Sequence, residues 1–101
     1  MQEVAAGVWI IEGTFVNVFL LEGRAGECVL VDSGFSYWRT AIEEGLKVLE
    51  RRGHRLAAIL LTHGHSDHSG SARHFAERYG VPIYVHRAEI PFLDGSSSYP
   101  P

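Results

Sequence analysis

The pattern of apolar residues changes along this chain. Its first third has short continuous apolar runs, whereas later segments repeat apolar residues every three or four positions. Apolar and β-branched runs at residues 8–12, 14–21 and 27–31 are separated by glycines, a pattern typical of a β-meander. Residues 37–52 and 71–79 instead repeat their apolar side chains every three or four positions, which predicts two amphipathic helices.

Glycines close both predicted helices, Gly53 after the first and Gly80 after the second, as left-handed caps. A continuous apolar run at residues 56–61 and a strand-like run at residues 81–86, VPIYVH, follow the helices. The first of these runs suits a strand that is buried on both faces, although periodicity alone does not separate so short a run from buried helix. We therefore expect a meander followed by the order β, α, β, α, β, which is a layered α/β fold.

Composition limits the classes of function that are open to the chain. It has 101 residues, 46% of them hydrophobic and 21% charged, as expected for one small soluble domain. A formal net charge of −3 provides no broad positive field, which argues against a nucleic-acid partner. No run approaches the roughly 20 apolar residues of a membrane span, and the N-terminus lacks the basic start of a signal peptide. We expect no membrane contact and a cytoplasmic location.

The single cysteine, Cys28, excludes an intramolecular disulfide and a cysteine-rich zinc site. It lies within the apolar run at residues 27–31, where a small buried hydrophobe is the better interpretation than a reactive thiol.

Residues 63–68 read HGHSDH and concentrate three histidines and one aspartate in one short turn. Imidazole nitrogens and carboxylate oxygens are preferred ligands of zinc and similar divalent ions. If the preceding strand continues in extended form, His63 and His65 point to the same side and can share one ion. Asp67 and His68 fall at the start of the next helix and can serve a second ion, although Asp67 also suits a helix N-cap.

These four residues resemble the HxHxDH signature of the metallo-β-lactamase fold superfamily. The resemblance implies that His63 and His65 bind a first metal, and that Asp67 and His68 bind a second.

The resemblance extends upstream of the motif. Residues 31–34, VDSG, are similar to the family's short acidic turn after an early strand, in which Asp32 orients the site. A plain turn or cap residue is the alternative for Asp32. The order of elements resembles the N-terminal half of the family's αββα sandwich. The resemblance therefore implies that residues 1–101 are a partial domain of this kind. The Gly, Ser and Pro content of the tail predicts a loop at residues 94–101.

The family resemblance also implies an activity, metal-assisted hydrolysis with metal-bound hydroxide as the nucleophile. Asp67 would hold the metal and orient the nucleophile. Zinc is the expected cofactor, as one or two ions, with iron or manganese as alternatives. The acidic balance disfavours a nucleic-acid substrate, and the lack of a signal peptide disfavours a periplasmic β-lactamase. We therefore expect a small-molecule ester, thioester or lactone as the substrate.

Family members take further metal ligands from a region well beyond this motif, so we expect the remaining ligands beyond Pro101 and weak metal binding by these residues alone. The alternatives are a non-catalytic fragment and a subunit that self-association or a complementing chain completes.

Other residues are weaker candidates for the site. His86 ends the run at 81–86 and lines the same crevice if parallel strands end together; a simple strand-end residue is the alternative. His54 and His74 are expected to be solvated. The aromatic residues that would wall a pocket, with the core as the better place for the tryptophan, are Trp38, Phe92 and Tyr99.

Overall fold

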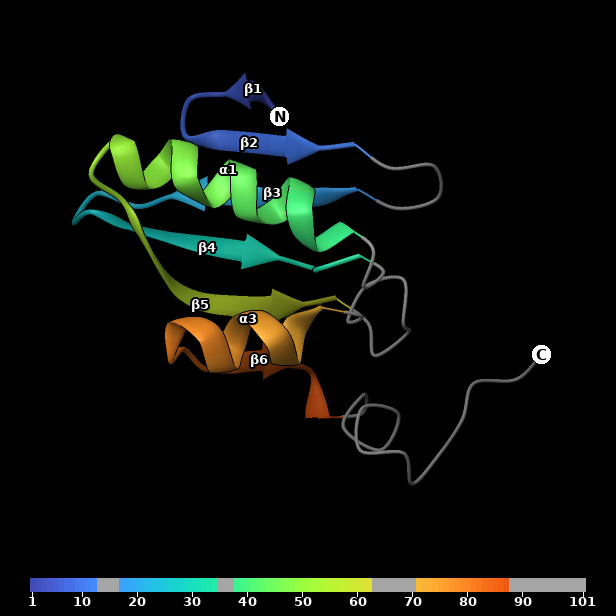
Figure 1. The fold of residues 1–101 in the computed structure, drawn as a ribbon. Coiled ribbons are helices and arrows are strands. Elements are labelled where there is room, and N and C mark those ends of the chain that lie inside the picture. The colour runs from blue at the N-terminus through green and yellow to red at the C-terminus, as the bar shows by residue number, and fades with distance from the viewer. Residues whose placement is uncertain (13–16, 35–37, 63–70, 88–101) are drawn as a thin grey trace.

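A computed structural model describes residues 1–12, 17–34, 38–62 and 71–87 of the chain. In these residues one six-stranded sheet has the order β1-β2-β3-β4-β5-β6, so each strand lies beside its neighbour in sequence (Figure 1). The strands are β1 (Gln2–Ala5), β2 (Val8–Ile11), β3 (Val18–Glu22), β4 (Glu27–Val31), β5 (Arg55–Leu61) and β6 (Ile83–Val85). The helices are α1 (Arg39–Arg51), between β4 and β5, and α3 (Ala72–Tyr79), between β5 and β6.

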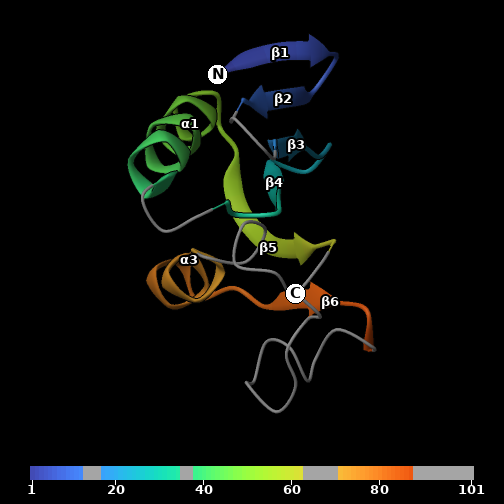
Figure 2. The same ribbon diagram turned by 90° about the vertical axis from the view of Figure 1, so that its right-hand side faces the viewer.

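The first four strands form an antiparallel meander, and β5 and β6 extend it in parallel with β4. Both helices pack on the same face of the sheet (Figure 2). α1 lies against β2, β3 and β5, whereas α3 lies against β5 and β6. The core between helices and sheet is made of fully buried side chains, the largest of which are Phe75, Leu20, Leu30, Ile42, Leu46, Leu49 and Ile59.

α1 packs closely on the meander at Gly45. A Cβ atom at this position would lie 2.8 Å from Met1 Sδ, 3.1 Å from Leu20 Cδ1 and 3.3 Å from Ile11 Cδ1, so a larger residue would require the ends of these side chains to shift. The helix is followed by Gly53 with a φ of 86°, and α3 ends at Gly80 with a φ of 65°. Both left-handed glycines confirm the helix ends predicted from the sequence.

The layered α/β order is confirmed, with differences in detail. The sequence pattern does not predict β1, because its four side chains are all exposed and show no apolar alternation. It forms by edge pairing with β2, which is a tertiary contact. The strand expected from residue 14 is described from Val18 onward, since residues 14–16 lie outside the described ranges.

The prediction that residues 56–61 are buried on both faces is wrong for the described structure. Leu60 on β5 is 43% exposed, whereas Ile59 is fully buried. The reason is that α1 and α3 cover only the face to which Ile59 points.

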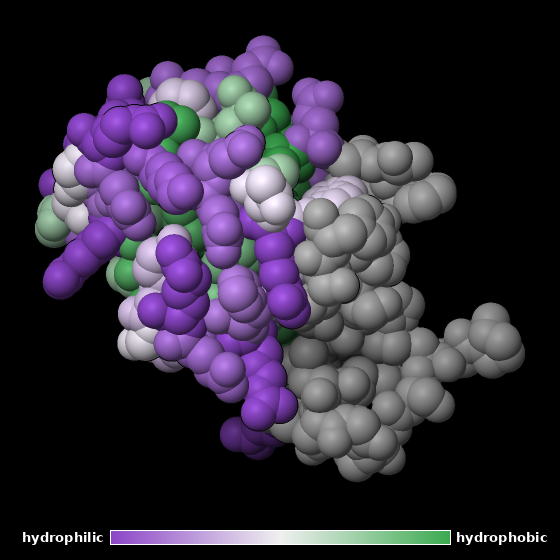
Figure 3. Space-filling view, viewed as in Figure 1, coloured by the Kyte–Doolittle hydropathy of each residue, from purple (hydrophilic) through white to green (hydrophobic). Residues whose placement is uncertain are grey.

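The face opposite the helices carries apolar side chains. Cross-strand pairing places Leu60 beside Tyr84, which is 58% exposed. The side covered by the helices presents mainly hydrophilic residues to solvent (Figure 3). No helix in the described part of the chain has the length and apolar character needed to cross a membrane.

Candidate metal centre

The three parallel strands β4, β5 and β6 have their carboxyl ends side by side, along a border of the sheet that is called the carboxyl edge. The register pairs Val31 of β4 with Leu60, and Leu61 of β5 with Val85. The residues that directly follow these strands therefore lie along the same edge, toward which the arrows of β4, β5 and β6 point in Figure 1; they are Asp32, Thr62 and His86. Because ligands of α/β folds bind at the carboxyl ends of parallel strands, this edge is the candidate site.

Asp32 connects the ends of β4 and β5. Its Oδ1 accepts a hydrogen bond of 2.8 Å from the Thr62 backbone N–H, and its Oδ2 accepts one of 2.8 Å from the Thr62 hydroxyl. Asp32 is buried and has a φ of 62°, a left-handed conformation that few residues other than glycine adopt. Thr62 directly precedes His63, so the structure places Asp32 next to the start of the predicted metal turn.

Ser33 makes the corresponding contact on the other side of the turn. Its Oγ accepts a hydrogen bond of 3.1 Å from the backbone N–H of Ser71, the N-cap residue of α3. Sequence reasoning identified the VDSG turn but did not single out Ser33 or Thr62. The available signal was weak, a small polar residue one position after an apolar strand for Thr62 and two positions after one for Ser33.

The predicted ligands themselves, His63, His65, Asp67 and His68, lie outside the described residues. Their placement around a metal therefore stays a prediction. Within the described ranges, which omit residues 63–70, no group of three or more His, Cys, Asp or Glu side chains is arranged to hold a metal ion. The donor set fits a divalent ion by its chemistry, because three imidazoles and one carboxylate occur within the six residues that follow Thr62 in the sequence.

The remaining candidates divide between this edge and the core. The register brings His86 level with Thr62, although a role as metal neighbour stays a prediction. Trp38 packs against the buried core, and its ring lies over Gly34, which supports the core alternative for Trp38. Phe92 and Tyr99 lie outside the described residues.

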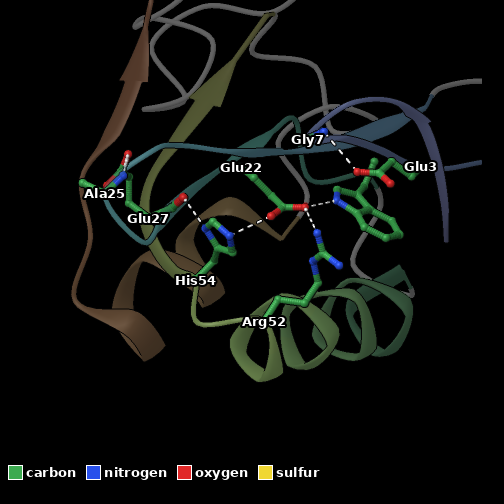
Figure 4. A network of polar contacts seen from close by, with 8 residues as sticks. Glu3, Gly7, Glu22, Ala25, Glu27, Arg52 and His54 are labelled. Carbon is green, nitrogen blue, oxygen red and sulfur yellow. Dashed lines mark hydrogen bonds and ion pairs between the residues drawn. The ribbon is translucent and has the colours of Figure 1, made fainter.

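The expectation that His54 is solvated is wrong. Its Nε2 lies 2.7 Å from Oε2 of Glu22, and its Nδ1 lies 3.2 Å from the carbonyl oxygen of Glu27 (Figure 4). Arg52 reaches the other oxygen of the Glu22 carboxylate at 3.4 Å, and the indole N–H of Trp9 donates to that oxygen as well. This cluster lies near the amino end of β5, far along the strand from the candidate site.

His74 is also only partly solvated. Its Nε2 lies 3.3 Å from Oε1 of Glu43, and its ring packs edge-on against Phe75. Both histidines are better described as structural contacts of the helices than as ligands.

The family model of the metallo-beta-lactamase superfamily matches residues 11–101. The chain belongs to this superfamily. The superfamily assignment agrees with the HxHxDH motif and with the contact between the VDSG turn and the residue before that motif.

Curated proteins are similar to this chain over part or nearly all of its length. The probable metallo-hydrolase YflN of Bacillus subtilis is 35% identical over 101 residues, which are 98% of this chain and 38% of that protein. The hydroxyacylglutathione hydrolase of Buchnera aphidicola is 39% identical over 62 residues, 61% of this chain and 22% of that protein.

Solved structures show the same fold. BJP-1, a subclass B3 metallo-beta-lactamase of Bradyrhizobium japonicum, superposes with a TM-score of 0.73 at 18% identity, over 88% of this chain and 33% of that one. At this identity the likeness concerns the fold alone. The chain thus spans between about a fifth and two fifths of the length of these superfamily members.

Proposed function

We propose that this chain supplies the HxHxDH part of a metal-dependent hydrolase, with His63 and His65 on one divalent ion and Asp67 and His68 on a second. Superfamily membership supports this proposal. The observation that carries it is the hydrogen bond between Asp32 and Thr62, the residue directly before the motif in the sequence, at the edge where parallel strands end.

Zinc is the proposed metal, as one or two ions, and iron or manganese would accept the same donors. When bound, a divalent ion lowers the pKa of a coordinated water and polarises the bond under attack. The chain's own contribution is to hold the ions with imidazole and carboxylate groups and to orient the nucleophile through Asp67. Asp32 contributes by keeping Thr62, and with it the start of the ligand segment, at the end of β4.

We propose a small-molecule ester, thioester or lactone as the substrate. The net charge of −3 disfavours nucleic acid, whose binding depends on neutralised phosphates. The Buchnera relative is named as a hydrolase of hydroxyacylglutathione, which is a small acylated molecule. A cytoplasmic location is part of the proposal, because Cys28 is a buried free thiol that suits a reducing compartment.

The motif offers two donors for each ion, whereas a catalytic zinc normally takes three protein ligands and a water. We propose that the remaining donors come from a further polypeptide segment of a longer chain, from a complementing chain or from a second copy. A non-catalytic fragment with a weak metal site is the alternative.

Native mass spectrometry of the chain in zinc-containing buffer tests metal binding and assembly together. We expect zinc uptake by the wild type, loss of that uptake in a His63→Ala/His65→Ala variant, and unchanged uptake in the control His74→Gln. Stoichiometric zinc in the double variant would contradict the proposal. A dimer that holds about one or two ions per chain would indicate donors supplied by a second copy, and ester, thioester and lactone probes should then be hydrolysed only by the wild type and the control.

A further inference from the structure

Two adjacent residues of one turn contact both ends of the segment that carries the proposed ligands. Asp32 binds Thr62, the residue before that segment, through hydrogen bonds to its backbone and hydroxyl. Ser33 binds Ser71, the residue after it, with 3.1 Å between Ser33 Oγ and the Ser71 nitrogen. The eight residues 63–70 therefore leave and re-enter the described fold at neighbouring points of a single turn.

The turn that contains Asp32 and Ser33 can hold the residues bound to it in place, because it is buried and its backbone is conformationally restricted. Ser33 and Ser71 are both fully buried. On either side of Ser33 the backbone is left-handed, with a φ of 62° at Asp32 and 60° at Gly34, and the ring of Trp38 covers Gly34. Such strained conformations persist where the surrounding structure holds them, and they concentrate at functional sites.

Ser71 also fixes the start of α3. Its carbonyl oxygen accepts a hydrogen bond of 3.1 Å from the Phe75 N–H, the first turn of the helix, and the Phe75 side chain is fully buried in the core. The bond from Ser71 to Ser33 thus ties the beginning of α3 to the end of β4. Asp67 and His68 precede Ser71 by only four and three residues in the sequence, so Ser71 is the first described residue after them.

We propose that Ser33 is a positioning residue for the Asp67 and His68 ligands, and that it acts through its hydrogen bond to Ser71. This inference rests on the proposed metal-binding function. In this proposal the two adjacent residues of the turn support different ends of the ligand segment. Asp32 supports the end that begins with His63, and Ser33 supports the end near His68. Groups that orient metal ligands from outside typically contribute tenfold or more to metal affinity.

The test is a zinc titration of the full chain in competition with a chromophoric chelator. We expect Ser33→Ala to bind zinc about tenfold more weakly than the wild type, and Ser33→Thr, which keeps the hydroxyl, to recover most of the loss. Hydrogen exchange of the Ser71 amide should become faster in Ser33→Ala and return toward the wild-type rate in Ser33→Thr. Ile42→Val, a buried change in α1, is the control for a general loss of stability and should leave zinc affinity unchanged.

A double-mutant cycle separates positioning from mere folding. In a chain that already carries Asp67→Ala and His68→Ala, adding Ser33→Ala should change the residual zinc affinity by less than about twofold. An equal loss in both backgrounds would overturn the proposed role, as would unchanged affinity in the Ser33→Ala single variant. If the wild type takes up no zinc, the proposed function fails together with this inference; if it takes up zinc and Ser33→Ala has no effect, only the inference fails.

Discussion

Single residues at the end of β4 decide how the candidate site is supported. Asp32 combines a buried carboxylate, two hydrogen bonds to Thr62 and a left-handed backbone. Aspartate and asparagine tolerate this conformation better than other non-glycine residues. The side chain and the backbone conformation of Asp32 therefore contribute separately to the stability of the fold, and substitutions can distinguish the two contributions.

We expect Asp32→Ala to lower the free energy of unfolding by about 1–3 kcal/mol through the lost hydrogen bonds, with about 1 kcal/mol more from backbone strain. Asp32→Asn should cost less than Asp32→Ala, because its side-chain oxygen still accepts from the Thr62 N–H and its backbone tolerates the positive φ. Urea unfolding measures both. Equal losses in the two variants would show that the strain argument is wrong.

Cys28 is a second residue whose surroundings determine its chemistry. Burial, with smaller contributions from Glu22, Glu50 and Glu27, raises the pKa of its thiol to about 11, and the side chain is 1% exposed. At pH 8 the thiol is therefore almost wholly protonated in the folded chain. We expect alkylation by iodoacetamide to be about a hundredfold slower in the native chain than in urea, where the pKa returns to its ordinary value. Similar rates in the two conditions would contradict this expectation.

At the scale of elements, a polar cluster joins the end of α1 to the meander. Glu22 on β3 is held by the indole N–H of Trp9 from β2, and by Arg52 and His54 from the segment after α1 (Figure 4). The hydrogen bond from Trp9, with the nearby charges of Arg52 and His54, holds the pKa of Glu22 below its usual value despite the opposing effect of burial. The ionised form of Glu22 is thus the one that the fold stabilises.

The lowered pKa of Glu22 determines how its contribution to folding stability changes with pH. Because the folded-state pKa of Glu22 is lowered, its contribution is present above the unfolded value of 4.5 and is lost as the pH falls through the folded value. We expect Glu22→Gln to lower the free energy of unfolding by about 1–3 kcal/mol at neutral pH, and by clearly less at about pH 3.5. Urea unfolding at the two pH values measures the difference.

Glu77→Gln is the matched control, because its partner Arg73 is 90% exposed and Glu77 itself is 69% exposed. This pair should contribute less than about 0.5 kcal/mol at either pH. A Glu22→Gln effect that stays constant between the two pH values would argue against an ionic origin.

At the scale of the whole molecule, the two faces of the sheet differ. Helices cover one face, and the other presents apolar side chains such as Leu60 and Tyr84, which are 43% and 58% exposed. Contiguous exposed apolar surface is characteristic of interaction sites and binds hydrophobic dyes. Within the described residues, the sheet face opposite the helices thus offers an exposed apolar surface to a hydrophobic probe.

We expect a Leu60→Ser/Tyr84→Ser variant to bind the dye ANS less than the wild type, with a stability change near 0.5 kcal/mol or less because both side chains are largely exposed. Ile83→Ser is the control: this residue is 36% exposed but pairs with Ile59, and so lies on the helix side. Fluorescence titration measures the binding. A decrease in the control equal to that in the double variant would show that the opposite face has no special role.

Much of this architecture was predictable from the sequence because it depends on local patterns. Apolar spacing of three and four residues predicted both helices, and their glycine caps have the expected positive φ values. The HxHxDH motif predicted the superfamily, since that combination of donors at that spacing is rarely found without a metal site.

The tertiary structure decided what depends on contacts between distant segments. No local pattern indicates that β1 pairs at the sheet edge, that His54 binds Glu22 across 32 positions of sequence, or that Ser33 binds Ser71. These contacts depend on how the strands pair; at the candidate site, the register brings the end of β4 beside the end of β5. The sequence by itself determined which donor side chains lie together along the chain, because a motif is a local property. Only the packed sheet decided which residues hold Thr62 and Ser71, on either side of that motif, because these contacts join segments that are distant in the sequence.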